Sequence, residues 1–209
     1  MPVHFVEAFV LLFTVIDPIG VAAAFFALTY GANPAAQRAM AVRGTALAAA
    51  ILAVFGLGGD DLLRVLGIGI PAFRIAGGLL LLLLSIDMIL ARHSGIRSTT
   101  RDEELEAVSK EDVSVFPLAF PLIAGPGALT TVLLMASSGK GAAALFGTFG
   151  ALALVLALTL LSLTFAPRIL GFLGETGINV VSRLLGVILT ALAVQYILDG
   201  LRQSLFAGG

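Results

Sequence analysis

The chain has 209 residues, of which 59% are hydrophobic and 12% charged, whereas soluble domains are about 45–50% apolar and about 25% charged. This composition excludes a soluble single domain and indicates a polytopic membrane protein. Cysteine is absent, which excludes disulfides and thiolate metal sites. The formal net charge is -1, and this balance gives no electrostatic footprint for nucleic acid.

Six apolar stretches are long enough to cross a bilayer as helices. The apolar runs are unbroken rather than alternating, which favours helices over barrel strands and predicts an all-α membrane protein. The second stretch is the weakest, because only 16 residues separate Arg43 from Asp60, and we expect Arg43 to extend towards the interface. The predicted spans are residues 5–28, 40–57, 68–90, 113–135, 142–165 and 178–198.

Residues 92–112 hold ten of the charged residues and divide the chain into two halves of three spans, 1–91 and 113–209. With the N-terminus outside, eight lysines and arginines fall on the side of this loop and four on the opposite side. Basic residues concentrate on the cytoplasmic side of membrane proteins. We therefore expect a cytoplasmic loop, both termini outside and a multi-pass protein of the inner (plasma) membrane.

The two halves carry matching motifs. Asp17-Pro18-Ile19-Gly20 aligns with Gly125-Pro126-Gly127 at an offset of 108 positions, and Phe73-Arg74-Ile75-Ala76-Gly77 aligns with Ser182-Arg183-Leu184-Leu185-Gly186 at an offset of 109. Because each half has an odd number of spans, the halves must be inserted with opposite topology. Such inverted repeats recur in secondary transporters, whose site lies at the midplane where the halves meet.

These motifs, together with residues 116–127 and 178–186, resemble the MarC family of bacterial and archaeal inner-membrane proteins over essentially the whole chain. The family has Asn-Pro or Asp-Pro in its first span, and this chain has Asp17-Pro18. The resemblance implies six membrane helices and membership of the lysine-exporter-like superfamily. It also implies a substrate like that of some archaeal relatives, which carry neutral amino acids such as glycine and alanine.

Asp17 is the one acid in the middle of a predicted span, where an ionised carboxylate is costly unless it is paired or hydrated. Asp followed by Pro is a preferred start of a helix, because Asp caps the first N–H groups and Pro fits the first turn. We therefore expect the first helix to break and restart at Asp17. Two interpretations stand: Asp17 only caps a kinked helix, or it binds substrate or a proton together with Pro18 and Gly20.

The fourth span is rich in helix-breaking residues, which predict a second broken helix that restarts near Pro126. Its free N–H groups and positive dipole end would then lie at the midplane, with two threonine hydroxyls one turn on. Close helix packing through small residues is the alternative explanation. The residues concerned are Pro117, Pro121, Gly125, Pro126, Gly127, Thr130 and Thr131.

Together the two breaks predict a site for a small zwitterion. Its carboxylate would sit on the N–H groups around Gly127 and Ala128, where the helix dipole favours negative charge. Its ammonium would face Asp17. Small side chains at Gly20, Ala124, Gly125 and Gly127 would leave room for little more than a methyl group.

Further polar residues lie in the third and sixth spans. Arg74 and Arg183 occupy repeat-related positions, where each either extends to the headgroups or forms a gating ion pair with Asp87 or Asp199. Asn179, Ser182 and Gln195 add polar groups to the sixth span. We expect Gln195 to face the interior of the bundle.

Three classes of function are open to such a membrane protein: a secondary transporter, an intramembrane enzyme, and a non-transporting membrane assembly or regulatory protein. An enzyme needs a nucleophile with a base, or paired acids, within the membrane, and a lone Asp17 argues against one. His4 and His93 have no second ligand at metal spacing, so no metal or cofactor is expected. The expected partners are the lipid bilayer and a small-molecule substrate with a coupling proton or sodium ion; a homo-oligomer is left open.

The orientation can be tested with a single cysteine, because the chain has none of its own. Ser98→Cys lies in the loop that the basic residues assign to the cytoplasm. We expect an impermeant thiol reagent to leave this variant unlabelled in intact cells and to label it after the cells are opened. Labelling of intact cells would contradict the assigned orientation.

Overall fold

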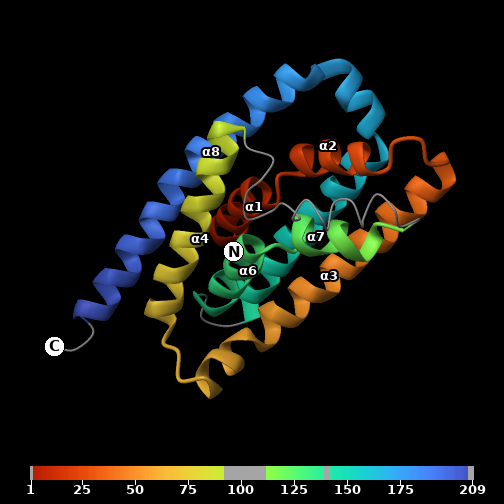
Figure 1. Ribbon diagram of the computed structural model, residues 1–209. Coiled ribbons are helices and arrows are strands. Elements are labelled where there is room, and N and C mark those ends of the chain that lie inside the picture. Colours follow the sequence, from red (N-terminus) through yellow and green to blue (C-terminus); the bar gives the residue numbers. More distant parts are fainter. Residues whose placement is uncertain (1, 92–111, 139–141, 207–209) are drawn as a thin grey trace.

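The computed structural model describes residues 2–91, 112–138 and 142–206 (Figure 1). Five helical segments are long and apolar enough to cross a membrane, and the first of them, His4–Leu28, runs through the break at Asp17. A sixth span results when the bent pair Ser114–Ile123 and Pro126–Ser137 is counted as one. No strand occurs in these described ranges. The helical elements are α1 (Pro2–Ile16), α2 (Pro18–Leu28), α3 (Pro34–Val65), α4 (Ile70–Leu90), η1 (Ser114–Ile123), α6 (Pro126–Ser138), α7 (Ala142–Thr164) and α8 (Ala166–Phe206). The charged segment 92–111, including Ser98 and His93, lies outside the described residues.

The predicted all-helical architecture is confirmed, and the limits of the third and fifth spans agree with α4 and α7 within two residues. The second span was predicted too short, as 40–57. Helix α3 begins earlier because the side chain of Asn33 accepts the N–H of Ala35 at 2.9 Å, with a proline next in the chain. It continues past Asp60 because this part of the helix still packs inward, with Gly59 against Leu133 and Leu63 buried. Within this extension Arg64 pairs with Asp60 at 2.9 Å, one turn away in the same helix.

The sixth span was also predicted too short, as 178–198. Helix α8 covers Ala166–Phe206 and is interrupted at Gly174, which has φ 62° and ψ 174°. Glycine has no Cβ and adopts positive φ without strain. The glycine interruption and the polar Glu175 therefore separate a short leading segment, residues 166–173, from the long part of the helix.

The beginning of η1 is tied to α3 by a surface ion pair. Arg43 donates to Asp112, which also accepts the N–H of Ser114 at 2.9 Å. Hydrogen bonding from Ser114, together with the charge of Arg43, lowers the pKa of the Asp112 carboxyl from its usual value. Both side chains are about half exposed, so this pair contributes little to stability.

Helices α4 and α8 lie antiparallel along one side of the molecule (Figure 1) and approach closely at glycines. A Cβ atom on Gly78 would lie 2.8 Å from the carbonyl oxygen of Ala193, and one on Gly186 would lie 3.1 Å from that of Ser85. Between these contacts the hydroxyl of Thr190 donates to the Ser85 hydroxyl at 2.9 Å. Small residues and interhelical hydroxyl bonds are the usual means of helix association in lipid.

The broken span of each half packs mainly on helices of the other half. Helices α1 and α2 of the first half pack on α7 of the second, while η1 and α6 of the second half pack on α3 of the first. Likewise α2 contacts α8, and α6 contacts α4. This packing puts the broken spans in the centre, whereas α3, α4 and α8 expose large apolar side chains such as Val54, Leu79 and Leu184.

The glycine contact between α4 and α8 predicts a local effect on stability. Gly78→Ala puts a methyl group against a backbone carbonyl that cannot move without shifting α8, and such overpacking costs about 1–3 kcal/mol. We expect a lower midpoint of thermal unfolding in detergent. Gly58→Ala on α3 is the matched control, because nothing lies within 4 Å of its added Cβ. Equal midpoints for the two variants would contradict the close packing.

Candidate functional site at the helix breaks

The first break lies at Asp17, as predicted. Helix α1 ends at Ile16, and Asp17 has the left-handed conformation with φ 51° and ψ 71°. Pro18 then begins α2, because a proline disfavours a helical conformation in the residue before it and needs no N–H partner in the first turn. The Asp17 carboxylate caps the new helix by accepting the N–H of Gly20 at 3.1 Å.

The Asp17 side chain is enclosed, with 3% of its surface exposed. It lies directly over Gly20, where a Cβ atom would come within 2.2 Å of Oδ2. From the other half of the chain, the Ser182 hydroxyl of α8 donates to Oδ2 at 3.5 Å. A carboxylate at this depth needs such donors, because an ionised group is costly to bury without partners.

The second break lies between η1 and α6, which meet at a bend of 58°. Phe116 and Phe120 have extended backbones, with φ -130° and -137°, since each precedes a proline. Helix α6 begins at Pro126, where the restart was predicted. The preceding Gly125 leaves no space for a side chain, because a Cβ atom there would lie 2.5 Å from the carbonyl oxygen of Pro121.

The start of α6 offers N–H groups that have no acceptor within the helix, as every helix start does. These first donors belong to Gly127 and Ala128, since the N–H of Leu129 already donates to Gly125 at 3.0 Å. The hydroxyls of Thr130 and Thr131 donate to the carbonyls of Pro126 and Gly127 at 2.9 and 2.8 Å. Their hydrogens are therefore used, and their oxygens can only accept further hydrogen bonds.

The two breaks are neighbours in the interior of the bundle. A Cβ atom on Gly127 would lie 3.3 Å from the Val15 side chain, two residues before Asp17. The same position is covered from α4 by Leu81 and Leu84, and Gly77 makes room for the methyl group of Thr130. The two broken spans thus meet where Val15 of α1 approaches Gly127 of α6. Apolar side chains cover the start of α6, so the site is closed in this conformation.

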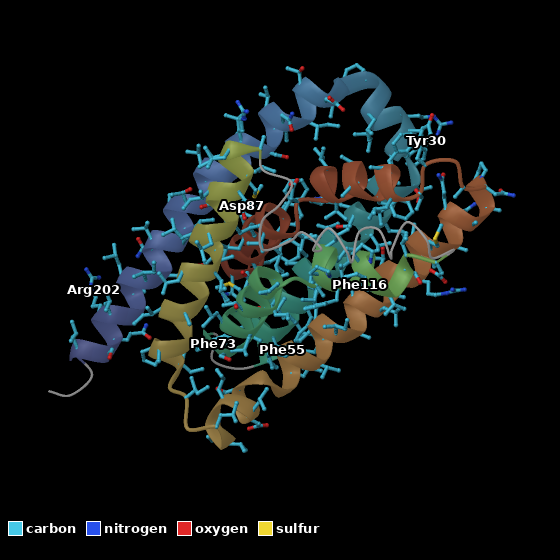
Figure 2. All side chains as sticks on the ribbon, viewed as in Figure 1. Tyr30, Phe55, Phe73, Asp87, Phe116 and Arg202 are labelled. Carbon is cyan, nitrogen blue, oxygen red and sulfur yellow. The ribbon has the colours of Figure 1, made fainter. Side chains whose placement is uncertain are left out.

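The polar residues expected on α4 and α8 differ in exposure. Arg74 and Asn179 are half-buried, and Asp87 lies on α4 (Figure 2). Arg183 is exposed and has no ion-pair partner among the described residues. Gln195 is exposed as well and donates to Asp199 at 2.9 Å. The expectation that Gln195 faces the interior is therefore wrong: a partner one turn away holds it on the outer surface.

Ser182 was not predicted as a site residue, although it is the α8 side chain that reaches Asp17. The available signal was its position beside Arg183 in a repeated motif that also carries Gly186. A single apolar sequence cannot say which face of a membrane helix turns inward when both faces meet apolar surroundings. In the part of the chain that the structure describes, no three histidine or acidic side chains come together as a metal site would require.

Comparison with known proteins gives a match over nearly the whole chain. Residues 3–205 match the model described as MarC family integral membrane protein. A UPF0056 membrane protein of Methanocaldococcus jannaschii is 36% identical over 97% of this chain and 98% of its own length. UPF0056 membrane protein YvbG of Bacillus subtilis is 36% identical over 94% and 93% of the two chains. YhcE of Escherichia coli, of the same description, is 33% identical over 96% and 93%. No solved structure matches the chain.

The geometry at Asp17 predicts a coupling between two substitutions. Gly20→Ala should lower the unfolding midpoint of the parent, because the added methyl group displaces the capping carboxylate, and a lost cap costs about 0.5–2 kcal/mol. In an Asp17→Ala background the carboxylate is gone, so Gly20→Ala should have no further cost. An equal loss of stability in both backgrounds would show that the carboxylate does not occupy the position over Gly20.

Proposed function

This chain belongs to the MarC family of integral membrane proteins, and on that premise we propose that it is a secondary transporter of small neutral amino acids or similar small metabolites. The observation that carries the proposal is the contact between two broken helices in the interior of the bundle. One carries the buried carboxylate of Asp17, and the other begins near Gly127 with N–H groups that have no acceptor within the helix. Discontinuous helices of this kind form the substrate sites of many transporters.

The packing supports an arrangement of the two halves as inverted repeats. Such a symmetry pairs the contacts between elements of the two halves, and the main contacts of the broken spans follow it. Among the described residues, the smaller contact of α1 with α8 has no counterpart of similar extent between η1 and α4. The contact of α1 with α7 corresponds to that of η1 with α3, and the contact of α2 with α8 corresponds to that of α6 with α4. The equivalent helices α4 and α8 are antiparallel, as opposite insertion requires. Rocking of one half against the other then provides alternating access.

The chemistry of the two breaks suits a zwitterion. The substrate ammonium would be held by Asp17, with Ser182 as a neighbour that fixes the carboxylate. The substrate carboxylate would accept from the N–H groups of Gly127 and Ala128 at the positive end of α6. Leu81, Leu84 and Val15 fill this space in the closed state. A substrate therefore has to displace them, which limits its side chain to a small apolar group.

Asp17 also provides a means of coupling, because an acidic side chain inside a membrane span can exist either with a proton or with a negative charge. Protonation would remove the charge that holds the ammonium, so proton binding and substrate binding would compete. Sodium coupling would instead use oxygen ligands, for which the hydroxyl oxygens of Thr130 and Thr131 have free lone pairs. On the helices beside these breaks, Arg74, Asn179 and Arg183 are the polar residues proposed to respond as the halves move.

Uptake by proteoliposomes tests the proposal. Purified protein is reconstituted and supplied with labelled alanine or glycine, with a proton gradient, a sodium gradient or neither. We expect uptake that one gradient accelerates, and a loss of about tenfold or more in Asp17→Asn, because a charge-assisted hydrogen bond to the ammonium is lost. The helix cap survives in this variant, since asparagine also caps helices.

Asp61→Asn is the matched control, because it removes an acid from the exposed surface of α3. It should transport as the parent does. Full activity of a folded Asp17→Asn protein at every pH would reduce Asp17 to a helix cap. Absence of any uptake by folded parent protein would favour the alternative, a non-transporting membrane assembly or regulatory protein.

A further inference from the structure

A groove of about 480 Å³ lies beside the first helix break and is separate from the contact between the two breaks. It is lined by Phe13 of α1 and by Pro18 and Ile19, the residues that follow Asp17, and Pro18 is buried. One wall is the C-terminal part of α7, with Leu158 and Leu161. The segment before Gly174, the start of α8, forms the other wall.

The outer wall of the groove has the character of a membrane-interface helix. Residues 166–173 are turned away from the rest of α8 by the positive φ of Gly174. Phe172, which lines the groove, is 90% exposed, and Phe165 at the α7–α8 junction is 39% exposed. Exposed Phe side chains beside a basic residue are typical of the apolar face of a helical segment that lies in the membrane interface. The groove therefore opens to lipid near one surface of the membrane.

The charges at the groove have one sign. Arg168 is the only charged residue among the described residues that line it, and Ser162 is the only other polar one. The Arg168 guanidinium lies 5.3 Å from the centre of the Phe165 ring, which holds it at the rim. An apolar slot with one cation at its mouth complements a molecule with an alkyl chain and an anionic head. Its volume is within the range of sites for small organic ligands, about 300–1,000 Å³.

We propose that this groove binds an anionic phospholipid, with its phosphate at Arg168 and one acyl chain running inward to Pro18 and Ile19. Arg168 belongs to the side of the membrane on which basic residues are in excess, and basic pockets between membrane helices on that side bind anionic lipid headgroups. Since Pro18 and Ile19 directly follow Asp17, the bound chain packs against the restarted helix. The lipid site does not depend on whether the protein transports a substrate.

Native mass spectrometry of the purified full-length chain tests this site. The protein is equilibrated with phosphatidylglycerol and phosphatidylcholine that carry identical acyl chains. We expect the parent to retain phosphatidylglycerol preferentially. Arg168→Gln should lower this retention about tenfold, because the phosphate loses a charge-assisted partner. Leu161→Trp should lower retention of the lipid as well, because the larger side chain fills the slot.

Two controls separate this site from general adhesion of lipid. Arg202→Gln removes an exposed arginine near the C-terminal end of α8 (Figure 2), and Val54→Trp enlarges an exposed apolar side chain on α3. Neither residue lines the groove, so both variants should retain lipid as the parent does. The proposal is overturned by equal retention of the two lipids, by loss of lipid in the controls to the same extent, or by displacement of the lipid by inorganic phosphate alone.

Discussion

The carboxylate of Asp17 is 3% exposed inside an apolar bundle, where it accepts the N–H of Gly20 and the hydroxyl of Ser182. The chain stops being helical at Asp17 and restarts at Pro18, which frees N–H donors at that depth and lowers the cost of burying this group. The left-handed backbone of Asp17, the bare Gly20 beneath the carboxylate and the inward-facing Ser182 all follow from this requirement. A continuous first helix would leave the carboxylate without its cap.

The second break completes this arrangement through packing. Because α1 and α2 pack on α7 while η1 and α6 pack on α3, both interrupted spans are surrounded by continuous helices. Irregular backbone at membrane depth is stable only under such cover. The close approach of α4 and α8 at Gly78 and Gly186 forms the flank of the bundle. From this flank Ser182 reaches Asp17, while Leu81 and Leu84 cover the start of α6.

The sequence was sufficient to predict both breaks, because Asp-Pro and the cluster of prolines and glycines in the fourth span act on the local backbone. It was less informative about helix limits. The charged residues after the second predicted span were assigned to a loop, yet Asp60 and Arg64 pair within α3 and the helix continues through them. The inward face of α8 could not be predicted, because lipid and protein interior are equally apolar. Ser182 was therefore missed as a partner of Asp17, and Gln195 was assigned to the wrong face.

If the two helix breaks meet and act together in transport, a reversible cross-link between them should control uptake. Val15→Cys and Gly127→Cys are combined in this chain, which has no other cysteine. The Val15 side chain lies 3.3 Å from the Cβ position at Gly127, close enough for a disulfide. We expect oxidation to join the two halves and to stop alanine uptake, and reduction to restore that uptake. The control pair, Val15→Cys with Val54→Cys, should not cross-link. Failure of the first pair to cross-link, or undiminished uptake by the cross-linked protein, would contradict the account.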